Sequence, residues 1–162
     1  MTESAGARDL QTLGAVRRVL SLLLLVALIG TFIELLLLEH DESALQVIPL
    51  VLLACGVVAL VSTTLHPRVI VVTMFRISMV LLILSGALGL ALHYRANLEF
   101  QRDLTPSLGS VELFWKVMAA KAPPALAPAV LAQLGGLGLV YAYRLPVRSH
   151  RSAIGESDVE VH

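Results

Sequence analysis

The sequence predicts an all-α integral membrane protein, a four-transmembrane-helix bundle with an extracytoplasmic amphipathic helix between helices 3 and 4. Hydrophobic residues make up 57% of the 162 residues, charged residues make up 15%, and the mean hydropathy is +0.82. This apolar share exceeds that of soluble domains. The apolar residues also cluster in runs that are long enough to cross a bilayer as helices. The last two runs are separated by about thirty residues, a connection long enough to carry structure of its own.

The first two predicted spans cover residues 19–38 and 47–65. The first, "VLSLLLLVALIGTFIELLLL", would form a helix of roughly 30 Å, which matches the thickness of the hydrocarbon core. The second ends before Pro67, which cannot continue a helix. Pro49 lies near its beginning. This proline requires either a helix that starts near Ile48 or a kink in the first turns.

The third predicted span covers residues 77–94, because a charge such as Arg76 costs less at the interface than inside the bilayer. Residues 68–75 are predicted to form a helical entry at the headgroups. The fourth span covers residues 125–143, where tyrosines and an arginine are typical of a membrane interface and Pro146 stops the helix. The four spans together define a transmembrane domain over residues 19–143.

Basic residues predict the orientation of the bundle. Four crossings place the predicted tails, residues 1–18 and 144–162, on the same side, and most of the arginines lie there: Arg8, Arg17, Arg18, Arg68, Arg76, Arg144, Arg148 and Arg151. Because short loops rich in Lys and Arg stay in the cytoplasm, we expect both termini there. The strong preference for Arg over Lys suggests a GC-rich bacterial genome, and hence a bacterial inner membrane.

The outer connection, residues 95–124, is predicted to be helical in two parts. Arg95, Glu99 and Arg102 are spaced to pair along one face, so the third helix should continue into water until "TPSLGS" breaks it. The following segment "SVELFWKVMAAKA" has apolar residues at i, i+3, i+4 and i+7, which predicts an amphipathic helix on the outer leaflet. The candidate interaction surface is formed by His93, Arg95, Asn97, Glu99, Phe114, Trp115 and Lys116.

Few residues suggest chemistry. Glu34 is the only acidic residue within a predicted span, and it could either reach the surface, pair with Arg95, or serve as a proton- or cation-coupling group. His40, Asp41 and His93 are weak metal-ligand candidates, since imidazole and carboxylate suit transition metals. No spacing matches a metal signature, so no cofactor or metal is expected. The single cysteine, Cys55, excludes a disulfide within the chain.

Small residues predict close helix packing through Ser85 and Gly89 in the third span and Ala129, Ala132 and Gly136 in the fourth. This packing can be internal or can join two copies. With zero net charge, nothing favours nucleic acid as a partner. We expect membrane lipid and another membrane protein, or a second copy, as partners. The predicted role is a non-enzymatic accessory, assembly or stabilising subunit of a membrane complex. Two alternatives are an oligomeric transporter or channel that uses Glu34, and a membrane enzyme or redox protein with a site at His93, Asn97 and Glu99.

Overall fold

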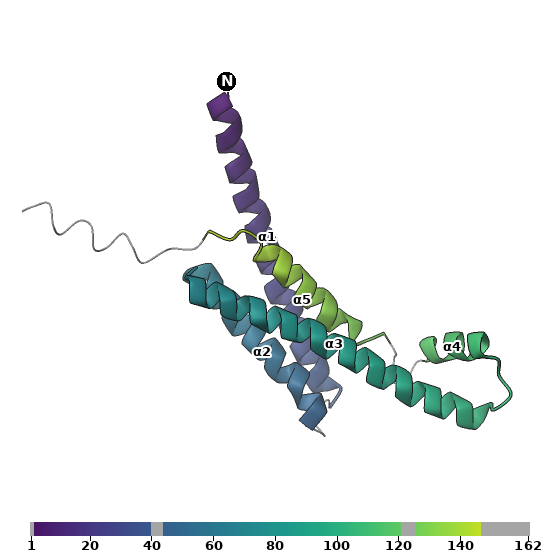
Figure 1. Ribbon diagram of the computed structural model, residues 1–162. Helices are drawn as coiled ribbons and strands as arrows, with labels where there is room; N and C mark the ends of the chain where they lie inside the picture. The colour runs from purple at the N-terminus through teal and green to yellow at the C-terminus, as the bar shows by residue number, and fades with distance from the viewer. Residues whose placement is uncertain (1, 40–43, 121–125, 147–162) are drawn as a thin grey trace, which may run out of the picture.

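The computed structural model describes residues 2–39, 44–120 and 126–146, and these segments contain helices and no strand. The all-helical prediction is therefore confirmed for this part of the chain. Figure 1 shows the five helices in order: α1 (Thr2–Leu37), α2 (Ala44–Leu65), α3 (Val69–Leu104), α4 (Ser110–Met118) and α5 (Ala129–Tyr141).

Three of these helices are long and apolar enough to cross a membrane, over Leu10–Leu37, Ala44–Leu65 and Val69–Leu104. Helix α5 is apolar but has only 13 residues, about 20 Å of helix against a hydrocarbon core of about 30 Å. The structure thus describes a membrane protein with three membrane-length helices and a shorter fourth one. The predicted span over residues 125–143 is longer than the helix because residues 126–128 form a turn and α5 begins after Pro128.

Two helices start earlier than predicted. Helix α1 begins at Thr2, so most of the predicted N-terminal tail is helical. Its residues include Ala, Leu, Arg and Gln and no proline, a composition that favours a helix. Helix α2 begins at Ala44 and continues across Pro49, which excludes the first of the two alternatives, a start near Ile48. Pro49 lies close to the helix start, where its missing N–H removes a single bond from the ladder.

Helix α3 is the centre of the fold and contacts α2, α4 and α5, while α1 contacts α2 and α5. The core between them is formed almost entirely by large apolar side chains: Leu24, Leu28, Leu53, Leu60, Phe75, Met79, Leu82, Leu131, Leu134 and Tyr141. The rings of Phe75 and Tyr141 meet edge to face, with centroids 5.8 Å apart. The outward surfaces of the helices are also rich in Leu, Ile and Val, as expected where the surrounding solvent is lipid.

Helices α3 and α5 approach each other through glycines. A Cβ on Gly86 would lie 2.7 Å from the backbone nitrogen of Ala132 and 2.8 Å from the carbonyl oxygen of Pro128. A Cβ on Gly135 would collide with the carbonyl oxygen of Met79. Small residues let helix backbones approach closely, which is a main source of helix association in membranes. The short α5 is therefore held along its length against α3.

Candidate functional site

Helix α3 is longer than a membrane crossing, and its exposed face shows where the excess lies. Between Arg76 and Arg95 the exposed side chains include Leu84 and Leu88 and no charged residue. This interval corresponds to about 29 Å of helix, close to the thickness of the hydrocarbon core. Arg95 and Glu99 are exposed beyond it and form an ion pair of 3.2 Å. The last turns of α3 therefore project out of the apolar layer, and the prediction that this helix continues to the "TPSLGS" break is confirmed, because α3 ends at Leu104.

Helix α4 folds back along this projecting part of α3, as Figure 1 shows. Val117 is fully buried, and the ring of Phe114 lies 6.2 Å from that of Tyr94 on α3. The turn between the helices is fixed by Thr105, whose backbone N–H and hydroxyl both donate to the carbonyl oxygen of Gln101. The two helix segments thus form a hairpin, residues 94–118, which we call the α3–α4 hairpin.

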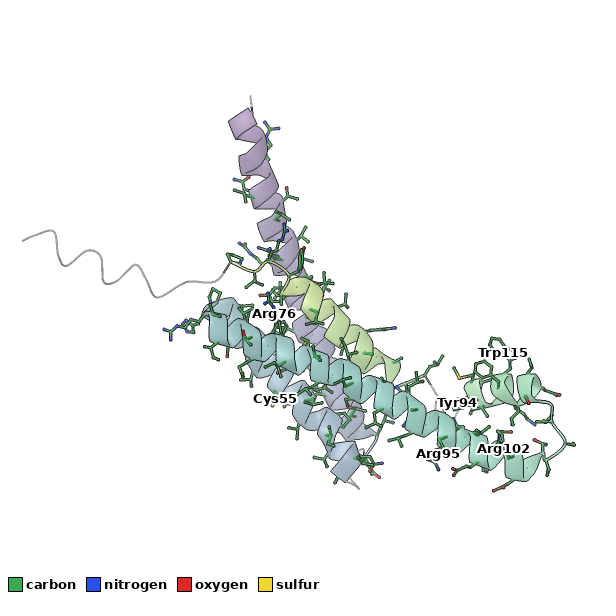
Figure 2. The ribbon with its side chains drawn as sticks, viewed as in Figure 1. Cys55, Arg76, Tyr94, Arg95, Arg102 and Trp115 are labelled. Carbon is green, nitrogen blue, oxygen red and sulfur yellow. The ribbon has the colours of Figure 1, made fainter. Side chains whose placement is uncertain are left out.

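Much of the apolar surface of α4 remains uncovered in this hairpin. Val111 is 73% exposed and Trp115 is 66% exposed. Figure 2 shows Trp115 on the side of α4 that is turned away from α3. The predicted apolar spacing includes the outward-facing Val111 and Trp115 together with Phe114, which contacts Tyr94. The fully buried residue of α4 is Val117, which the pattern did not single out. Leu113, one turn before it, is half-buried, so apolar residues occupy two sides of this helix.

The structure divides the predicted interaction surface into buried and exposed residues. Asn97 is only 2% exposed, on the face of α3 that carries Tyr94, and His93 is half-buried. Arg95 lies on the opposite side of α3, turned away from α4 in Figure 2. The exposed members are Arg95, Glu99, Phe114, Trp115 and Lys116. His93, Asn97 and Glu99 therefore do not share one surface, because Glu99 is paired with Arg95 on the far side.

Glu34 lies on the outward surface of α1, where its side chain is exposed. It does not pair with Arg95, which bonds to Glu99. Gly30, one turn earlier, has open space where a side chain would stand. Glu34 thus lines no interior path of the single chain.

The metal-ligand candidates His40 and Asp41 lie outside the described residues. Within the described segments, no group of three or more His, Cys, Asp or Glu residues is arranged to hold a metal ion.

Only some of the small residues predicted to pack lie at the contact between α3 and α5. Gly89 faces Pro128, and Ala132 faces Gly86, while Ser85 and Ala129 are half-buried. Gly136 has no neighbour within 4 Å of the place where its Cβ would be. The closest approaches are made instead by residues that the prediction missed: Gly86, Gly135 and Gly138. The sequence "GGLG" signals close packing, but only the rotation of α5 relative to α3 decides which glycine is used.

Arginines gather at the opposite end of the bundle from the hairpin, around the end of α5. Arg17 of α1 donates to the carbonyl oxygens of Tyr143 at 3.3 Å and Arg144 at 3.0 Å. Arg76 of α3 donates to the carbonyl oxygen of Ala142 at 2.8 Å. These carbonyls belong to the C-cap residue Ala142 and to the turn that follows α5, beyond the last helical residue, and the guanidinium groups donate to them there. Arg144 adopts a positive φ of 48°, and Arg17 fixes this turn.

A scan against models of protein families finds no match, and searches of curated proteins and of solved structures also find none.

Proposed function

We propose that this chain is a non-enzymatic accessory subunit of a membrane complex and that the α3–α4 hairpin binds its protein partner. The observation that carries this proposal is the exposure of apolar side chains on a segment that projects from the membrane. Phe100 and Leu104 of α3 are each 59% exposed. Val111 and Trp115 on the outer face of α4 are 73% and 66% exposed. Several large apolar side chains exposed on one projecting segment are typical of a binding surface.

The height of these residues favours protein over lipid as the partner. Leu104 follows Arg95 by nine residues, about 13 Å of helix, whereas the headgroup layer is only about 5–8 Å thick. Lipid headgroups can cover Trp115. Its neighbour Phe114 contacts Tyr94, which precedes Arg95 at the edge of the apolar layer. Lipid headgroups cannot cover Leu104. The predicted spans support a non-enzymatic role. Their only acidic residue is Glu34, which is exposed on the outward surface of α1. Catalysis and transport in a bilayer use polar groups that face the protein interior.

The test is the mass of the assembly that forms around a tagged chain purified in mild detergent. The wild-type chain is expected in a defined assembly larger than one chain. The double variant Phe100→Ala, Leu104→Ala should weaken the assembly about thirtyfold, since two anchors that become buried on binding each contribute about 1 kcal/mol or more. The matched control is Leu84→Ala, Leu88→Ala, which truncates exposed leucines of the same helix within the apolar layer. A wild-type chain at single-chain mass, or equal losses in both variants, would contradict the proposal.

The proposed topology has four crossings with both termini in the cytoplasm of a bacterium and the hairpin outside. Its support is the direction of α5, which runs from Pro128 beside Gly89 to Ala142 beside Arg76 and so returns along α3. A reporter fused after Pro146 should be inaccessible to a membrane-impermeant label in intact cells, and a cysteine at Ser107 in a Cys55→Ala background should react. Labelling of the reporter but not of the cysteine at position 107 would mean that the orientation is the opposite one. Labelling at both positions would mean that α5 does not cross the membrane.

A second candidate function is an oligomeric transporter or channel that uses Glu34. It is favoured by the exposure of this carboxylate on an apolar helix beside the open Gly30, because membrane carboxylates usually face a protein interior. A second copy could enclose both groups. Glu34→Gln in reconstituted vesicles should then abolish proton-coupled flux, whereas Glu39→Gln, just beyond the helix, should not. Equal flux in wild type and Glu34→Gln would remove this candidate.

A further inference from the structure

The end of α5 gathers three positively charged side chains that form no ion pair with the residues that the structure describes. Arg17 and Arg76 donate to the carbonyls of residues 142–144, and the guanidinium of Arg144 lies 5.5 Å from the ring centroid of Tyr143. Among the residues that the structure describes, the only ion pair is the one between Arg95 and Glu99, far away in the hairpin. A helix C-terminus contributes only about half a negative charge. The cluster formed by Arg17, Arg76 and Arg144 therefore has an excess of positive charge.

The three guanidinium groups also keep unused donors. Each guanidinium carries five N–H donors in a planar fork, and Arg17 and Arg76 each bond to carbonyl oxygens through a single terminal nitrogen. The Arg144 guanidinium contacts the ring of Tyr143, and within the described segments it forms no ion pair. Unused donors on neighbouring arginines suit the oxygens of a phosphate, which they can bind in pairs.

The depth of the cluster indicates where that phosphate comes from. Arg76 directly precedes the stretch of α3 that carries no Asp, Glu, Lys or Arg up to Arg95, and Arg17 lies beside the start of the corresponding stretch of α1. This position agrees with the level at which the hydrocarbon core meets the headgroups. Tyr143 is exposed beside them, as is typical of the aromatic belt at this level. We propose that Arg17, Arg76 and Arg144 form a binding site for the phosphate of an anionic phospholipid, in the leaflet at this end of the bundle.

Two reasons favour an anionic over a zwitterionic lipid. The headgroup of phosphatidylcholine carries its own quaternary ammonium, which the three arginines repel. Phosphatidylglycerol carries the same phosphate with no positive charge, so its binding neutralises one charge of the cluster. Arginine rather than lysine at all three positions agrees with bidentate recognition of phosphate oxygens. This site is independent of the partner-binding hairpin.

The test uses delipidated full-length protein in neutral detergent, with phosphatidylglycerol or phosphatidylcholine of identical acyl chains added and bound lipid counted by native mass spectrometry. We expect about tenfold tighter binding of phosphatidylglycerol. Arg144→Gln and Arg17→Gln should lower it to the level of phosphatidylcholine. The matched control, Arg102→Gln, removes an exposed arginine from the hairpin end and should change nothing. Because Arg144 holds no carbonyl through its side chain, its variant tests the site without unfolding the end of α5.

Each other outcome would overturn the proposal. Equal binding of the two lipids would mean that the cluster does not select charge, and an equal loss in Arg102→Gln would mean that the effect is not local. Inorganic phosphate that displaces phosphatidylglycerol at equal concentration would identify a site for a free anion. The segment after Pro146 contains Glu156, Asp158 and Glu160. Phosphatidylglycerol binding that appears only after deletion of residues 147–162 would identify this acidic segment as the counter-charge instead.

Discussion

The variant Gly135→Ala is expected to lower the free energy of unfolding of the bundle by about 3 kcal/mol, the upper end of the cost of overpacking a core. The added Cβ would collide with the carbonyl oxygen of Met79 and lie 2.7 Å from a side-chain carbon of Ile83. A backbone carbonyl inside a helix cannot move aside, so α5 must shift away from α3 and lose contact along its length. Denaturation of the protein in mixed detergent micelles, followed by circular dichroism, measures the loss.

Two neighbouring glycines provide the controls for this variant. Gly136→Ala should leave the unfolding midpoint unchanged or slightly higher, because nothing lies within 4 Å of its Cβ position and alanine favours a helix more than glycine does. Gly138→Ala should have an intermediate effect, since its Cβ would meet the flexible side chain of Met79. Equal effects at Gly135 and Gly136 would show that α5 has a different rotation against α3.

The variant Val117→Asp is expected to detach α4 from α3 while the membrane-length helices stay folded. Val117 is 0% exposed, and an unpaired carboxylate in its place would cost several kcal/mol. The helix has only nine residues, too few to be stable without packing. Hydrogen exchange should show loss of protection over residues 110–118, with protection of α2 and α3 up to about Tyr94 unchanged.

The control for this variant is Val111→Asp, the same change at a position that is 73% exposed. It should leave the amides of α4 protected. If both variants lose protection, or neither does, Val117 is not the residue that docks α4. Because Val111→Asp places a charge on the proposed partner-binding face while keeping α4 folded, it also separates loss of binding from loss of structure.

The features that could be predicted from the sequence depend on local physics. The length of an apolar run predicts the length of a membrane helix without knowledge of its neighbours. The end of α3 at Leu104 is equally local, because the proline at position 106 cannot continue a helix. The early start of α1 is also consistent with helix propensity, although the polar character of residues 2–18 beside an apolar run predicts a tail. Helix propensity acts without tertiary contacts, so it should have carried more weight there.

The features that could not be predicted depend on how helices are rotated against each other. Asn97 was grouped with exposed residues because its neighbours Arg95 and Glu99 are charged, yet it lies on the covered side of the same helix. The rotation of the helices also explains why Gly135 and not Gly136 contacts α3, and why Val117 and not Val111 is buried. Arg17 and Arg76 are separated by most of α1, all of α2 and two connections, and only the fold brings both to the end of α5.

The short length of α5 has a consequence for biosynthesis. A segment that spans about two thirds of the hydrocarbon core gains too little from lipid to leave the insertion machinery by itself. The surface that accepts it, the glycine-containing face of α3, is made earlier by the ribosome and is already in place. We therefore expect α5 to be integrated late and by docking, so that a chain stalled before residue 129 would expose a small-residue groove to quality-control proteases.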